Sequence, residues 1–158
     1  MADKAFYFAY GSNMNTPQLR KRAPSAQPVG QGWLADSKLV CNKRSIDGSG
    51  KANLVRSPGN VVWGVLFNIR QDELLALDEA EGGYKRVKWA IHLENSESVF
   101  AWVYVARPDR VTDYPVPYDW YKKLIVEAAR EHGLPTDYVE MLEALPSKPD
   151  RRQGSGEN

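Results

Sequence analysis

The apolar residues in the first two thirds of this chain gather in short continuous or alternating runs, a pattern that predicts β-strands. The first run, residues 5–10, places aromatic side chains on one face and Ala, Tyr and Ala on the other. Because both faces are apolar, we expect this strand to lie inside a sheet. The turn formers Gly11-Ser12-Asn13 follow it, and Thr16 and Pro17 are typical of a helix N-cap and first helical position.

Further runs rich in β-branched and aromatic residues predict more strands. The clearest is residues 61–69, in which Gly64 indicates a bulge or a close approach of another backbone. Ser57-Pro58-Gly59-Asn60 is a strong turn signal just before it, and the polar turn 94–98 predicts a hairpin. The other predicted strands are residues 38–43, 52–56, 84–93 and 99–106.

Helical spacing appears in the segments between and after these runs. Residues 71–81 predict a short helix that Gly82-Gly83 ends. Residues 118–132 carry an apolar stripe at helical spacing. Pro135 is expected to open a last helix, with an apolar stripe made of Tyr138, Met141, Leu142 and Leu145.

About six strands and a few helices that do not alternate along the chain predict an α+β fold. We expect a mostly antiparallel or mixed sheet, closed into a small β-barrel with flanking α-helices. Residues 1–146 are expected to form a single domain. Residues 147–158 are polar and charged and contain Gly and Pro, so they predict a disordered C-terminal tail.

Composition and charge narrow the range of partners. With 21 basic and 20 acidic residues the formal net charge is +1, so we expect neither a nucleic-acid partner nor a charged membrane surface. The single cysteine, Cys41, argues against an internal disulfide, and His92 and His132 show no metal-ligand spacing. No apolar run reaches membrane-spanning length and no signal-peptide pattern is present, so we expect a cytoplasmic protein.

The Gly11-Ser12-Asn13 loop is the first candidate site. A loop held by a buried strand keeps its backbone N–H groups in place, where they can receive the negative charge of a small polar ligand. A tight turn after a core strand, without a ligand, is the plainer interpretation.

Glu81 is the second candidate. Leu74, Leu77, Asp78 and Glu81 share one face of the predicted helix, and the leucines mark that face as buried. Burial, the helix C-terminus and neighbouring acids would all raise the pKa of Glu81, which suits a general acid/base. The plainer interpretation is a frayed helix end with Glu81 in solvent. Asp78 is the second choice of carboxylate, and Glu79 is expected on the surface.

Three other residues receive mainly structural interpretations. Tyr121 begins the stripe of the helix 118–132 after a proline-rich loop, so its hydroxyl is a candidate for the mouth of a cleft, although core packing is the plainer interpretation. His132 is expected to be half-buried at the helix end, and Cys41 is expected to pack in or beside a strand.

The segments Tyr7-Phe8-Ala9-Tyr10-Gly11-Ser12-Asn13-Met14 and Leu77-Asp78-Glu79-Ala80-Glu81-Gly82 together resemble the two motifs of the γ-glutamylcyclotransferase family. The resemblance continues in Val62-Trp63-Gly64-Val65 and Gly133-Leu134-Pro135, and it covers most of the chain from about Phe6 to Leu145. The segment after Glu81 is shorter than the family pattern, which would open the leaving-group side.

This resemblance implies a small mixed β-barrel with flanking helices and the cyclisation of a γ-glutamyl group to 5-oxoproline, with release of an amino acid or amine. It implies no metal and no organic cofactor, a small-molecule γ-glutamyl substrate, and a monomer or a homodimer. Glu81 would be the catalytic residue. The implied substrate-binding residues are Tyr7, Phe8, Ala9, Tyr10, Gly11, Ser12, Asn13 and Tyr121.

Two alternatives to this activity stay open from the sequence. One is a relative that acts on γ-glutamylamines or on a γ-glutamyl-protected biosynthetic intermediate. The other is a non-catalytic small-molecule binding module on the same fold. Within the enzyme hypothesis, the Gly11-Ser12-Asn13 backbone holds either the substrate's α-carboxylate or the developing oxyanion.

Overall fold

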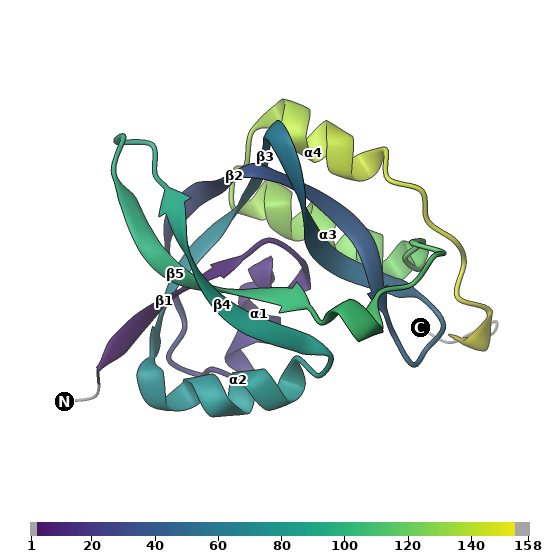
Figure 1. Ribbon diagram of the computed structural model, residues 1–158, viewed down its shortest axis with the longest axis horizontal. Coiled ribbons are helices and arrows are strands. Elements are labelled where there is room, and N and C mark those ends of the chain that lie inside the picture. The colour runs from purple at the N-terminus through teal and green to yellow at the C-terminus, as the bar shows by residue number, and fades with distance from the viewer. Residues whose placement is uncertain (1–2, 154–158) are drawn as a thin grey trace.

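The computed structural model describes residues 3–153, and its strands close into a barrel (Figure 1). The order around the barrel is β1-β3-β2-β4-β5, and every neighbouring pair is antiparallel except the parallel pair β1 and β5. The strands are β1 (Lys4–Ala9), β2 (Gln27–Arg44), β3 (Gly50–Arg70), β4 (Tyr84–His92) and β5 (Ser98–Ala106). This arrangement confirms the predicted mixed, mostly antiparallel barrel.

Four α-helices flank the barrel within the described residues. In Figure 1, α3 and α4 lie together beside the long strands β2 and β3, whereas α2 lies at the lower end of the barrel. The α-helices are α1 (Thr16–Arg20), α2 (Leu74–Ala80), α3 (Asp119–Glu131) and α4 (Thr136–Glu143). Short 3-10 turns are η1 (Ser12–Met14), η2 (Gln71–Glu73), η3 (Pro108–Arg110) and η4 (Arg151–Gln153). No helix in residues 3–153 is long and apolar enough to cross a membrane.

Strands β2 and β3 are longer than predicted, and the expected turn at residues 57–60 is wrong. Ala35 pairs with Val61 while Ser37 pairs with Arg56, so residues 57–60 form a bulge inside β3. The backbone N–H of Gly59 donates to Asp36 Oδ1 at 2.9 Å across this bulge. Turn-forming residues thus bend a continuous strand here and do not end it.

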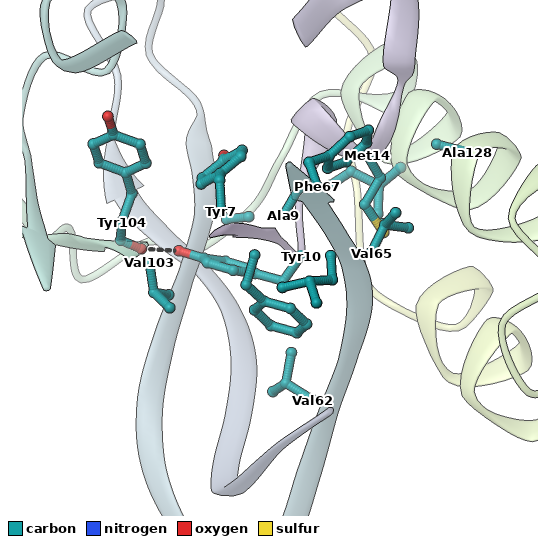
Figure 2. Packing of buried hydrophobic residues seen from close by; sticks show 14 of the residues in the cluster. Tyr7, Ala9, Tyr10, Met14, Val62, Val65, Phe67, Val103, Tyr104 and Ala128 are labelled. Carbon is teal, nitrogen blue, oxygen red and sulfur yellow. Dashed lines mark hydrogen bonds between the residues drawn. The ribbon is translucent and has the colours of Figure 1, made fainter. Parts of the chain in front are cut away.

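Strand β1 lies inside the sheet, as both of its apolar faces predicted. It pairs along its length with β3, and Tyr7 pairs with Trp102 of β5 to close the barrel. Just past its end, the Tyr10 hydroxyl donates to the Tyr104 carbonyl oxygen at 2.6 Å (Figure 2). The strand pairing of β1 and the hydrogen bond of the Tyr10 side chain therefore both fix the start of the loop after β1.

The helices that follow show two corrections. Asn15, and not Thr16, caps α1, because its side chain accepts a hydrogen bond from the backbone N–H of Gln18 at 2.9 Å. In α4 the buried residues are Tyr138, Val139 and Leu142, whereas Met141 is exposed. The predicted stripe is therefore confirmed at Tyr138 and Leu142, with Leu145 packed against the core, whereas Val139 takes the place of Met141.

The segment from residue 147, predicted as the start of a disordered tail, contacts α3 as far as the structure describes it. The N–H of Asp119 donates to the carbonyl of Lys148 at 2.8 Å, and Trp120 Nε1 donates to Asp150 Oδ2 at 2.9 Å. Residues 147–150 thus contact the first turn of α3, while residues 154–158 lie outside the described part of the chain.

Gly64 marks a close backbone approach, as predicted, and it pairs in regular register with Gly32, so no bulge forms there. A Cβ at this position would lie 2.4 Å from the Ala9 carbonyl oxygen and 2.7 Å from the ring of Phe8. Only a residue without a side chain allows β1 to pack this closely on β3.

We predict that Gly64→Ala lowers the free energy of unfolding by about 1–3 kcal/mol, the usual cost of overpacking a core. Gly82→Ala is the matched control, because a Cβ at Gly82 would meet no atom within 4 Å. Denaturant unfolding of both variants measures the difference. Equal stability of the two would contradict the close packing of β1 on β3.

Candidate active site

A cleft lies where the end of β1, the end of α2 and the start of α3 converge. Its inner part has about 290 Å³ of space, open solvent at its mouth included, and we call it the inner cleft. It is lined by Tyr7, Tyr10, Gly11, Ser12, Asn13, Ala52, Glu81, Tyr84, Tyr104 and Tyr121. Residues far apart in the sequence therefore meet in one small polar space.

A larger space adjoins it, and we call this space the outer cleft. It has about 760 Å³ of space, open solvent included, and shares Ser12, Glu81, Tyr84 and Tyr121 with the inner cleft. Its other lining residues are Gln18, Arg22, Lys43, Ser45, Lys51, Ala80, Gly82, Trp120 and Leu124. The inner cleft thus continues into a wider space along the side chains of these shared residues.

All but two of the residues predicted from the sequence for the site line the inner cleft. Phe8 and Ala9 line neither cleft, and their part in substrate binding stays a prediction. Both are essentially unexposed, and the Phe8 ring packs beside Gly64 of β3. Side chains alternate along a strand, which turns Phe8 to the opposite face from Tyr7.

Glu81 sits at the C-cap of α2 with its side chain 18% exposed. The helix-end backbone holds it firmly, because its N–H donates to the carbonyls of Leu77 and Asp78. Burial raises the pKa of Glu81, and nearby Arg22, Asn13 and Lys43 offset only part of that rise. The predicted placement in a cleft and the predicted direction of the pKa shift are confirmed, and a frayed, solvated Glu81 is excluded.

The neighbouring acids do not contribute to that shift in the way the sequence suggested. Asp78 forms two hydrogen bonds with Arg86, at 2.8 and 3.1 Å, and accepts a third from the Tyr104 hydroxyl at 2.6 Å. Partial burial alone would raise the pKa of Asp78, but these bonds outweigh it and hold the pKa below its ordinary value. Asp78 is thus a fixed anion in an ion pair, and Glu79 is exposed as predicted.

The Gly11-Ser12-Asn13 loop presents free backbone donors to the same cleft. Its own turn uses the N–H groups of Met14 and Asn15, which leaves those of Ser12 and Asn13 without an acceptor in residues 3–153. At Gly11 an added Cβ would lie 3.0 Å from that of Ala52, so the loop passes close to β3. Free N–H groups in a rigid loop suit a negatively charged atom of a ligand.

Asn13 holds this loop in place through a buried network. Its amide Nδ2 donates to the Tyr7 hydroxyl at 3.0 Å, and its Oδ1 accepts from Gln18 and Arg22, each at 3.3 Å. Arg22 Nη1 also lies 4.0 Å from Glu81 Oε2. The network therefore connects the loop to the buried carboxylate through one guanidinium.

Tyrosine hydroxyls form much of the remaining wall. Tyr121 lines both clefts, as its predicted place at a cleft mouth requires, and its hydroxyl accepts from the N–H of Ala52 at 3.1 Å. The Tyr84 hydroxyl donates to the carbonyl of Ala52 at 2.7 Å. Burial raises the pKa of both Tyr84 and Tyr121, so these hydroxyls stay neutral at physiological pH.

Sequence reasoning missed several lining residues. Tyr84 follows Glu81 by three positions, and that proximity was a usable signal. Tyr104, Lys43 and Lys51 lie on strands among ordinary strand residues and offered none. Their place in the site comes from the way the barrel closes.

The remaining candidates have structural surroundings. Cys41 is buried, and burial raises the pKa of its thiol to about 11. His132 caps α3, and its Nε2 lies 2.8 Å from the Met14 carbonyl oxygen. Within residues 3–153, no three His, Cys, Asp or Glu side chains come together in a way that would hold a metal ion.

Comparison with known proteins places the chain in a family. The family model described as the AIG2-like family matches residues 61–142. Human gamma-glutamylcyclotransferase is 33% identical over 150 residues, which cover 88% of this chain and 77% of the human protein. The mouse gamma-glutamylcyclotransferase is 35% identical over 146 residues, with the same coverage of both chains.

The fold agrees with this sequence similarity. A solved structure titled gamma-glutamyl cyclotransferase superimposes with a TM-score of 0.86 at 31% identity, covering 92% of this chain and 90% of the other. The resemblance that the two sequence motifs indicated is thereby confirmed over almost the whole chain. The chain belongs to the γ-glutamylcyclotransferase family of AIG2-like proteins, and it is an enzyme of this type.

Proposed function

We propose that this enzyme cyclises the γ-glutamyl group of a small substrate to 5-oxoproline and releases the attached amino acid or amine. The observation that carries the proposal is the buried carboxylate of Glu81, with its raised pKa, in one cleft with the free N–H groups of Ser12 and Asn13. A proton acceptor and donors for negative charge are the two elements that this reaction requires.

The reaction is an internal attack. The substrate's α-amino nitrogen forms a bond to its own γ-carbonyl carbon, and the bond from that carbon to the leaving nitrogen breaks. The α-ammonium group first loses one proton to solvent. As the free amine attacks, Glu81 takes a second proton from the same nitrogen and passes it to the leaving nitrogen, so one carboxylate serves both transfers. A raised pKa matches Glu81 to this exchange, because a general acid/base works best when its pKa lies near the working pH.

The small inner cleft suits the folded glutamyl chain. When the cleft holds the amine next to the carbonyl, the conformational entropy that ring closure requires is already lost on binding. This lowers the activation barrier by several kcal/mol. Within the described residues, the N–H groups of Ser12 and Asn13 are available to the negative charge that the glutamyl half carries and develops. The tyrosine hydroxyls around them complete a polar wall of neutral groups.

We predict that Glu81→Gln lowers kcat for γ-glutamyl dipeptides by about 100-fold or more, because an amide cannot exchange the proton and general acid–base groups contribute about 10²–10⁴-fold. Glu79→Gln, an exposed carboxylate two positions away, is the matched control and should keep wild-type rates. The readout is 5-oxoproline formation. Normal turnover by Glu81→Gln would refute the role of Glu81.

The burial of Glu81 predicts a pH dependence of stability. Since its pKa is raised in the folded protein, protonation stabilises the fold, and that contribution is lost as pH rises from the ordinary glutamate pKa of 4.5 through the raised pKa. Glu81→Gln does not titrate. We therefore expect the variant to be more stable than the wild type at pH 7 and to lose that advantage below pH 4.

Thermal unfolding of both proteins between pH 3.5 and pH 8 measures this difference. Glu79→Gln, whose parent carboxylate is exposed, should show no such pH-dependent gain. A Glu81→Gln advantage that stays constant across the whole range would contradict the raised pKa, while leaving the activity measurement to be judged separately.

A further inference from the structure

The outer cleft carries three cationic side chains beside a single carboxylate, Glu81. Two of the cations have partners. Arg22 lies 4.0 Å from Glu81 and donates to Asn13, and Lys51 Nζ lies 3.4 Å from Asp47 Oδ2. The third, Lys43, forms no ion pair with a carboxylate anywhere in residues 3–153.

Gly83 and the Tyr84 ring surround the Lys43 side chain in the outer cleft. A Cβ at Gly83 would lie 2.7 Å from Lys43 Cε and 3.0 Å from its Nζ, so the glycine makes room for the side chain. Gly83 also has a φ of +89°, a conformation that residues with side chains rarely adopt. The Lys43 ammonium lies 5.2 Å from the centre of the Tyr84 ring.

Lys43 is a half-buried cation with no ion-paired carboxylate in the described part of the chain. Burial lowers the pKa of Lys43, and the nearby Arg110 guanidinium lowers it further, while Glu81 acts in the opposite sense. A partly buried charge without a close counter-ion is costly, and an anionic ligand group would reduce that cost. The site is thus suited to an anion that residues 3–153 do not supply.

The position of Lys43 indicates which anion this is. In the proposed reaction, which this inference takes as its basis, the glutamyl half occupies the inner cleft, where Ser12 and Asn13 present their N–H groups. The group attached to the γ-amide must then extend past Glu81 and Tyr84, the residues shared with the outer cleft. Lys43 lines this outer part and is absent from the inner one.

We propose that the Lys43 ammonium binds the carboxylate of the leaving amino acid. Lys43 is then a specificity-determining residue, and the enzyme favours substrates whose leaving group carries a carboxylate next to the departing nitrogen. Leaving groups that are plain amines lack this contact. Lys43 contributes to binding and to the choice of substrate, whereas proton transfer stays with Glu81.

The test compares two substrates that differ only in this charge: γ-glutamyl-alanine and the same dipeptide with its C-terminal carboxylate converted to a carboxamide. For the wild type we expect kcat/KM to favour the carboxylate by about tenfold, the contribution of a hydrogen bond to a charged group. In Lys43→Gln the ratio should fall to about one, through loss of the carboxylate substrate alone. Lys43→Arg should keep the preference.

Lys123→Gln is the matched control, because it removes an exposed lysine of α3 and should keep the wild-type ratio. Thermal unfolding establishes that the variants are folded. A wild-type ratio near one would overturn the proposal. A Lys43→Gln variant that loses both substrates equally would also overturn it, since Lys43 would then act on the half that the two substrates share.

Calorimetric binding of the same two dipeptides separates this inference from the reaction on which it rests. If the wild type forms no 5-oxoproline from either dipeptide, the proposed function fails. Tighter binding of the carboxylate form, lost in Lys43→Gln, would still support the Lys43 contact in that case. Equal binding of both forms would overturn the contact as well.

Discussion

The burial of one carboxylate, that of Glu81, is the constraint on which the rest of this site depends. Leu74 and Leu77 fix the buried face of α2, and Glu81 follows on that face at the helix end, where it is held inside the cleft. Burial disfavours the charged form of this carboxylate, and Arg22 and Asn13 offset only part of that effect. The remainder appears as a raised pKa, which is the property that a proton-transfer group needs.

A buried carboxylate is useful only if the opposite wall of the cleft is equally fixed. Strand β1 provides that wall because it packs tightly on β3 at Gly64 and is bonded to β5 through Tyr10. Figure 2 shows the ring of Tyr7 beside that of Tyr104, with the ring centres 5.8 Å apart. The hydrogen bonds of Asn13 to Tyr7 and Arg22 hold the loop against this wall. The loop N–H groups and the Glu81 carboxylate therefore stay at a fixed separation.

How far the sequence predicts this site depends on whether the signal is local. Glu81 could be found because the helical period alone carries it onto the apolar face, and Tyr121 because it begins such a face. Phe8 lies outside both clefts, because a contiguous motif does not show which alternate side chains a strand turns away. The segment 57–60 has turn residues, but pairing with β2 keeps it within one strand. Lys43 gave no local signal, since only barrel closure brings it to the cleft.

The two ends of the cleft follow different physical rules. At the inner end, the side chains of Tyr7 and Asn13 are bonded to each other, and the loop N–H groups are held in place for the glutamyl half in the proposed reaction. At the outer end, the short connection through Gly82 and Gly83 leaves space for Lys43, which has no ion-paired carboxylate among residues 3–153. A prearranged inner end suits the part of the substrate that never varies. An unmatched cation suits the part that does vary, because it selects for charge and leaves the shape of the leaving group free.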